Sequence, residues 1–76
     1  MTDDDKNIIA DYMNWKWCRL RERYTRVING EREVIHWDRN DAARCANKMW
    51  VNPDIVKHCN IDQFFNDMAE WLRSKK

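Results

Sequence analysis

The fold depends first on residues 24–35, YTRVINGEREVI, in which Asn29-Gly30 separates two runs of alternating side chains. Asn-Gly between two such runs is the strongest short-range signal for a β-hairpin, because a type I′ turn needs a positive φ at both central positions. A two-residue loop predicts these cross-strand pairs: Ile28 with Glu31, Arg26 with Glu33, and Tyr24 with Ile35. The register sets Arg26 opposite Glu33, and such an oppositely charged pair favours the hairpin.

The first strand is expected to extend back from this turn to about Lys16, because residues 16–28 alternate with a period of two. The apolar face of the hairpin is then expected to comprise Leu20, Tyr24, Ile28, Ile35 and Trp37. A loop one residue longer would expose Ile35 and Trp37, so the two-residue loop is the preferred register. A two-stranded hairpin is marginal alone, and helices must therefore cover this face.

A helix is expected before the hairpin, over residues 3–14. Its apolar stripe, spaced for one face of a helix, consists of Ile8, Ile9, Tyr12 and Met13. Thr2 or Asp3 can cap its N-terminus. The aspartates that follow suit the positive end of the helix dipole.

A second helix is expected over residues 40–50, capped by Asp38 or Asn40. Its apolar face comprises Ala42, Cys45, Ala46, Met49 and Trp50. Asn52-Pro53 then indicates a cap and a first-turn proline, which open a short helical turn.

The last helix is expected over residues 61–73, where Asn60 with Gln63 resembles a capping box. Its broad apolar face comprises Ile61, Phe64, Phe65, Met68 and Leu72. The expected architecture is therefore α+β: a helix, a two-stranded antiparallel β-hairpin, then two to three helices packed on one face of the hairpin. With 76 residues, the chain is expected to form a single small domain, residues 1–76.

Composition and charge argue against several classes of function. The net charge is +1, from 14 basic and 13 acidic residues, so no global field draws the protein to nucleic acid or anionic lipid. No apolar run approaches the length of a membrane span, and the acidic start of the chain is unlike a secretory signal. We therefore expect a cytoplasmic protein that does not bind membranes.

The sequence contains no recognisable metal, cofactor or catalytic motif. Zinc sites usually contain close pairs such as C-x-x-C, and Cys18, Cys45 and Cys59 form none. Their odd number and wide spacing are also unlike a disulfide framework, and Cys18 and Cys45 are expected in apolar positions. Cys59 lies beside His58, but adjacency in sequence is not the spatial pairing that catalysis requires. We expect no enzyme activity, no metal and no cofactor.

One face of the hairpin is a candidate binding surface. It points away from the expected core and comprises Trp17, Arg19, Arg21, Arg23, Arg32 and His36. Only Asp38, opposite Arg21, balances its positive charge. Tryptophan and arginine are enriched among the residues that dominate binding energy at interfaces. The alternative is a solvated sheet face, a role that arginine also serves well.

The segment IADYMNW, residues 9–15, resembles the opening I-A-[ED]-[FY]-M-G-W of small phage and prophage proteins of unassigned function. In those proteins a Trp-Asp followed by a helix often comes later, as at Trp37-Asp38 here, and an amphipathic helix closes the chain. Asn14 stands where those proteins usually have glycine, so the turn at this position is not assumed to be the same as theirs. The resemblance implies a phage-encoded accessory protein in a bacterial cytoplasm and no catalytic residue.

Two hypotheses of function follow. The first is a small accessory protein that binds a host or phage protein, for example to inhibit a host defence or regulatory complex. The alternative is a nucleic-acid-binding accessory protein, in which Trp17 and Tyr24 stack on bases beside basic neighbours, namely Lys16, Arg19, Arg21, Arg23 and Arg26. A steep salt dependence would identify the alternative. A homodimer that joins tryptophans across a two-fold axis is a third option.

Overall fold

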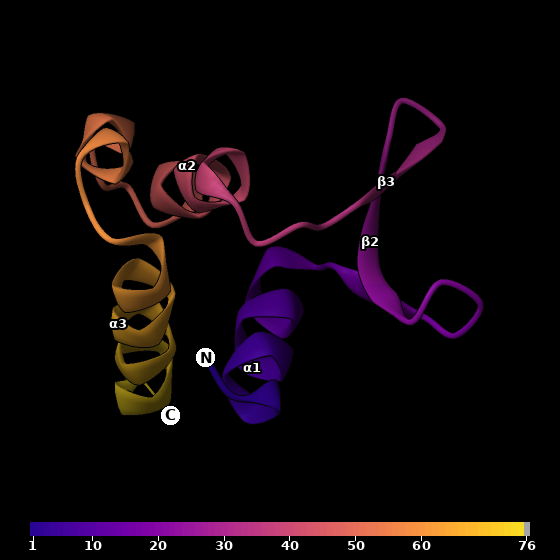
Figure 1. Ribbon diagram of the computed structural model, residues 1–76, viewed down its shortest axis with the longest axis horizontal. Coiled ribbons are helices and arrows are strands. Elements are labelled where there is room, and N and C mark those ends of the chain that lie inside the picture. Colours follow the sequence, from indigo (N-terminus) through magenta and orange to yellow (C-terminus); the bar gives the residue numbers. More distant parts are fainter. Residues whose placement is uncertain (76) are drawn as a thin grey trace.

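The protein has an α+β fold in which three α-helices accompany a three-stranded antiparallel sheet (Figure 1). The computed structural model describes residues 1–75. Along the chain the elements are α1 (Asp3–Met13), β1 (Lys16–Cys18), β2 (Arg23–Ile28), β3 (Glu31–Val34), α2 (Arg39–Lys48), the 3-10 helix η1 (Pro53–Lys57) and α3 (Ile61–Ser74). Within the described residues, none of the helices combines the length and the apolar character needed to cross a membrane.

The ends of α1 follow from local signals in the sequence. The Thr2 hydroxyl accepts a hydrogen bond from the backbone N–H of Asp5, and the Asp5 carboxylate accepts one from the backbone N–H of Thr2, both at 3.2 Å. This reciprocal pair is a capping box and confirms Thr2 as the cap. At the other end Asn14 has a φ of 62°, and the N–H of Trp15 donates to the carbonyl of Ala10 at 2.8 Å. Asn14 thus adopts the left-handed conformation that asparagine, after glycine, tolerates best.

The predicted hairpin and its register are confirmed. Ile28 pairs with Glu31 across a two-residue turn, and Asn29 and Gly30 have φ values of 52° and 81°, as a type I′ turn requires. Arg26 forms its predicted ion pair with Glu33 at 2.6 Å.

The prediction of one long first strand is wrong. Residues 19–22 form a turn instead, so that Cys18 pairs with Arg23 and Trp17 pairs with Tyr24. The sheet therefore has three strands in the order β1-β2-β3 rather than two. Residues 19–22 alternate with the period of a strand but contain neither glycine nor proline, and Glu22 supplies the turn with a φ of 51°.

The second turn changes which side chains are buried. Leu20, expected in the core, lies in the turn and is 97% exposed, and Ile28 is 40% exposed. Ile35 is buried as predicted, while Tyr24 and Trp37 are half-buried. The hairpin therefore lacks the continuous apolar face that the sequence predicted.

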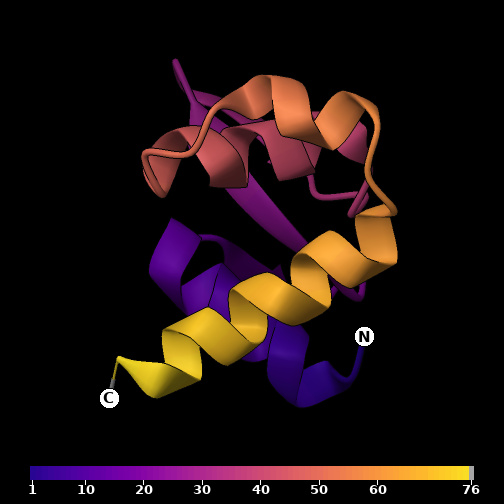
Figure 2. The same ribbon diagram turned by 90° about the vertical axis from the view of Figure 1, so that its left-hand side faces the viewer.

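The helices pack mainly against one another, not on one face of the hairpin as predicted. Helices α1 and α3 lie side by side, and α2 packs against η1 and α3, while the sheet projects to one side (Figures 1 and 2). The sheet reaches the core mainly through residues at its base, with Trp15 before β1 and Ile35 after β3. The buried core comprises Ile9, Ala10, Trp15, Ile35, Ala42, Cys45, Ala46, Val56, Phe65, Met68, Ala69 and Leu72.

The predicted cap of α2, Asp38, is confirmed, but the helix ends at Lys48 rather than at the predicted residue 50. The Asp38 carboxylate accepts a hydrogen bond from the N–H of Asp41 at 3.0 Å. After α2, Trp50 has a φ of 61° and is 96% exposed, so its expected place on the apolar face is wrong. The N–H of Val51 donates to the carbonyl of Ala46 and that of Trp50 to Asn47, at 2.9 and 3.2 Å. This is a Schellman ending, with tryptophan where glycine is usual.

The last part of the chain follows its predicted pattern. The side chain of Asn52 accepts a hydrogen bond from the N–H of Asp54 at 3.0 Å and so opens η1. Asn60 caps α3 by accepting from the N–H of Gln63 at 3.1 Å. The Gln63 side chain donates to Asp67 at 2.8 Å instead of bonding back to Asn60. Of the two hydrogen bonds of a capping box, the one from the Gln63 backbone to the Asn60 side chain is therefore formed.

Candidate binding surface

Arginines in this protein fall into two groups. Arg26, Arg44 and Arg73 form ion pairs with carboxylates, and Arg39 donates to the backbone carbonyls of Val56 and Cys59 at 2.6 and 3.1 Å. Four others have no carboxylate partner among residues 1–75. These four are Arg19, Arg21, Arg23 and Arg32. All four lie on the sheet or in its β1–β2 turn, and positive charge without an internal partner is concentrated there.

The structure brings these arginines to one region but divides the predicted face. Trp17 pairs with Tyr24, whereas Arg23 pairs with Cys18 in the adjacent cross-strand pair. Successive pairs point to opposite faces of a sheet. Trp17 and Arg23 therefore project from opposite faces, and their predicted alignment on one face is wrong. The reason is the turn at residues 19–22, which the alternation did not reveal.

Trp17 lies against Tyr24 and remains half-exposed. The ring centroids are 5.1 Å apart at an interplanar angle of 73°, an edge-to-face arrangement favoured by aromatic rings. Tyr24 contacts Trp37 at 6.0 Å, and Trp37 contacts the buried Phe65 at 5.2 Å. The exposed fraction of Trp17 is 54%, so an accessible indole is connected to the core through successive ring contacts.

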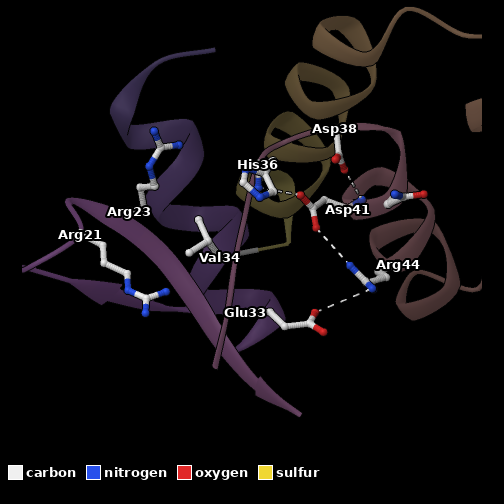
Figure 3. Close-up of a pocket in the computed structure, with 9 residues that line it drawn as sticks. Arg21, Arg23, Glu33, Val34, His36, Asp38, Asp41 and Arg44 are labelled. Carbon is white, nitrogen blue, oxygen red and sulfur yellow. Dashed lines mark hydrogen bonds and ion pairs between the residues drawn. The ribbon is translucent and has the colours of Figure 1, made fainter. Parts of the chain in front are cut away.

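A first hollow of about 700 Å³ lies between the sheet and the start of α2 (Figure 3). Its lining comprises Arg21, Arg23, Glu33, Val34, His36, Asp38, Asn40, Asp41 and Arg44. Figure 3 shows Arg21 and Arg23 on the opposite side of the hollow from Asp38 and Arg44. His36, predicted for the binding surface, therefore lines the same hollow as these two arginines, whereas Arg19 and Arg32 do not.

Carboxylates in the first hollow are already engaged by other groups. Asp41 is buried and accepts hydrogen bonds from the N–H of His36 at 2.9 Å and from Arg44 at 3.3 Å. A hydrogen bond from the backbone of Asp41 holds the pKa of Asp38 below its usual value. The hydrogen bond from Arg26 does the same for the pKa of Glu33. These acids are committed to the fold, which leaves Arg21 and Arg23 without a carboxylate partner among residues 1–75.

A second hollow of about 680 Å³ lies between α1 and the β1–β2 turn. Its lining comprises Asp3, Lys6, Asn7, Trp17, Arg21, Glu22, Arg23, Tyr24, Ile35 and Trp37. One side is formed by aromatic rings and the other by polar residues of α1. The Tyr24 hydroxyl donates a hydrogen bond to Asn7, which joins the two sides. Arg21 and Arg23 line both hollows.

Sequence reasoning missed part of this surface. Trp37 was assigned to the core, and Tyr24 was assigned both to the core and to the stacking surface of the nucleic-acid alternative, but both residues line the second hollow. Leu20 was also assigned to the core, yet it projects between Arg19 and Arg21. No local signal marks the turn that exposes Leu20. The pairing of Trp17 with Tyr24 could be found only from the register of β1 with β2.

The cysteines occupy different environments and do not gather. All three are free thiols, and no group of three or more His, Cys, Asp or Glu side chains that could hold a metal ion occurs within residues 1–75. Burial raises the pKa of Cys45 to about 12, in keeping with its predicted core position. Cys18 is only half-buried. Hydrogen bonding to the backbone of Arg21, with the nearby charge of Arg32, lowers the pKa of Cys18.

The chain matches no family model, no curated protein and no solved structure. No activity can therefore be transferred from a relative. The surface residues themselves are the basis for assigning a function.

Proposed function

We propose that this protein acts by binding another protein, and that the arginine-rich sheet is the surface that makes the contact. One observation carries the proposal: the sheet and its β1–β2 turn hold four arginines with no carboxylate partner among residues 1–75, and they also expose a tryptophan and a leucine. These six residues are Trp17, Arg19, Leu20, Arg21, Arg23 and Arg32. The partner that fits this surface is a protein with an acidic patch.

Physical chemistry favours this assignment over a merely solvated face. Arginine presents a planar set of donors that matches carboxylates in bidentate pairs. Tryptophan and arginine are also the residue types most enriched among interface hot spots. Leu20 is almost fully exposed between two arginines, and the apolar surface of its side chain would leave water on binding, which is favourable.

The cellular setting belongs to the same proposal. The resemblance of residues 9–15 to small phage and prophage proteins supports an accessory role in a bacterial cytoplasm. The partner would be a host or phage protein, and inhibition of a host defence or regulatory complex would suit such a role. No catalytic step is part of the proposal, and neither is a cofactor.

Nucleic acid is the second candidate, and one observation favours it. Trp17 exposes an indole in a hollow that Arg21 and Arg23 also line, and aromatic rings with basic side chains are a combination used to bind single strands. Two features weigh against it. The net charge is only +1, and the side chain at the tip of the turn is Leu20, which has no flat face to stack on a base.

Affinity capture from a bacterial lysate tests the proposal. We expect the tagged wild-type protein to retain a specific protein, and Arg21→Glu with Arg23→Glu to reduce its recovery by at least about tenfold. Lys57→Glu with Lys75→Glu is the matched control, because it makes the same change in net charge away from the sheet. Equal recovery by both double variants would contradict the assignment. Capture that is lost on nuclease treatment would favour nucleic acid instead.

A further inference from the structure

We propose that the two hollows together bind a short acidic segment of the partner that carries one large apolar side chain. Carboxylates of the segment pair with Arg21 and Arg23, and the apolar side chain lies against the aromatic side of the second hollow. This inference rests on the proposed function and specifies the chemistry of the partner. The binding site is defined by Trp17, Arg21, Arg23, Tyr24 and Trp37.

The aromatic side offers a surface that is already in place. Trp17 and Tyr24 meet edge to face at 5.1 Å, and Tyr24 meets Trp37 at 6.0 Å. Trp37 is held in turn by the buried Phe65 at 5.2 Å. Because the rings are fixed before binding, a partner does not lose affinity to the cost of ordering them. An apolar side chain that covers the exposed part of Trp17 would remove its surface from water.

Arg21 and Arg23 provide the charge that the segment must match. Both side chains line the two hollows, so they stand where one hollow meets the other. Neither has a carboxylate partner in the part of the chain that the structure describes. The acids of the first hollow are held by their own hydrogen bonds, as for Asp41 with His36 and Arg44. An incoming carboxylate therefore meets two available guanidinium groups.

Charges on the α1 side fix the orientation of the segment. Asp3 lines the second hollow together with Lys6 and Asn7 of α1, and its charge contributes, after burial, to raising the pKa of Tyr24. A carboxylate placed near Asp3 would be repelled. The acidic groups of the segment therefore lie toward Arg21 and Arg23, away from Asp3, and its apolar side chain lies against Trp17 and Tyr24.

A synthetic peptide provides a direct probe. The probe is acetyl-Glu-Glu-Phe-Glu-Glu-amide, and binding is followed by NMR through the indole N–H signals of the five tryptophans. We expect the signals of Trp17 and Trp37 to shift in a saturable way, while that of Trp50 stays in place. Two matched peptides test the chemistry: one has alanine in place of phenylalanine, and the other has lysines in place of the glutamates. Both should bind at least about tenfold more weakly.

Variants of the protein should change the affinity for the probe in opposite directions. Arg21→Glu and Trp17→Ala should each weaken binding of the probe by at least about tenfold, whereas Asp3→Asn should tighten it by removing a repulsive charge. Trp50→Ala is the matched control for loss of an exposed indole and should leave binding unchanged. Unshifted signals of Trp15 and Trp71 would show that each variant keeps its fold.

Several results would overturn the inference. They are a probe that moves neither Trp17 nor Trp37, an alanine peptide that binds as tightly as the probe, or weaker binding by Asp3→Asn. Competition by single-stranded oligothymidylate at lower concentration than the probe would assign the site to nucleic acid. If the probe fails while the arginine variant still loses its partner in affinity capture, the proposed function stands and the site is wrong. If the probe binds while capture is unaffected, the proposed function is wrong.

Discussion

Asp5, in the first turn of α1, forms an ion pair with Arg73, in the last turn of α3, although 68 positions separate them in the sequence. Asp5 is only 8% exposed. Its carboxylate accepts hydrogen bonds from Arg73 and from the backbone of Thr2, and these bonds lower its pKa. One side chain therefore completes the capping box of α1 and joins α1 to α3.

The first prediction is that Asp5 makes stability depend on pH. Because its pKa is lower in the folded state, the ionised carboxylate stabilises the fold above the unfolded pKa of about 4, and this contribution is lost as pH falls through the folded value. We expect Asp5→Asn to lower the free energy of unfolding by about 1 kcal/mol at pH 7 and by much less near pH 2. Urea denaturation at both pH values measures the difference.

The control for this prediction is Asp4→Asn. Asp4 lies in the same first turn and shares its helix dipole, but it is exposed and has no ion pair in the described chain. If Asp4→Asn destabilises the protein at pH 7 as much as Asp5→Asn does, then the ion pair with Arg73 contributes nothing beyond the dipole.

The second prediction concerns the end of α2. Trp50 has a φ of 61°, and its side chain is almost fully exposed, so it loses little packing on removal. Glycine adopts this conformation without the penalty of a Cβ, which is about 1 kcal/mol. We expect Trp50→Gly to raise the free energy of unfolding by about that amount and Trp50→Val to lower it. Thermal and urea unfolding compare the three proteins, and a less stable glycine variant would mean that Trp50 makes contacts in solution.

The third prediction concerns the β2–β3 turn. A Cβ added at Gly30 would meet no atom within 4 Å, so space does not restrict the position, but its φ of 81° does. We expect Gly30→Val to lower the free energy of unfolding by more than about 1 kcal/mol, because a β-branched residue is strained at positive φ. Gly30→Asn should cost less, since asparagine tolerates this region. Urea denaturation measures both variants. If they lose the same free energy of unfolding, the positive φ at Gly30 is not the cause of the destabilisation.

The fourth prediction concerns thiol reactivity. Cys18 has a lowered pKa and is half-buried, whereas Cys45 is fully buried with a pKa of about 12. The thiolate is the reactive form, so iodoacetamide at pH 8 should modify Cys18 well before Cys45. Peptide mass spectrometry gives the rates. Arg32→Ala should slow the reaction at Cys18, because the charge of Arg32 favours the thiolate. An unchanged rate would mean that the backbone hydrogen bonds alone lower the pKa of Cys18.

Local signals explain why much of the fold could be predicted from sequence. Thr2, Asp38 and Asn60 each cap a helix, as expected, and Asn29-Gly30 specifies the hairpin register. Such signals act within a few residues, so the chemistry of the side chain alone reveals them.

The features that were missed depend on contacts between distant segments. The turn before Arg23 contains no turn-forming residue, and Glu22 takes a positive φ there. Trp15 and Ile35 both reach the helical core, and this arrangement places the sheet beside the helices. For the candidate site, the sequence identified the arginines as a group. It could not place Trp17 on the face of Tyr24, because that requires the register of β1.

The limited attachment of the sheet has an evolutionary consequence. Its outer part, including the turn around Leu20, contributes nothing to the buried core. Substitutions there change what the surface presents while the helices keep most of the folding free energy, because surface positions away from the core rarely alter stability by more than about 0.5 kcal/mol. A lineage whose partner keeps changing could therefore vary the sequence of this turn rapidly and still retain a folded protein.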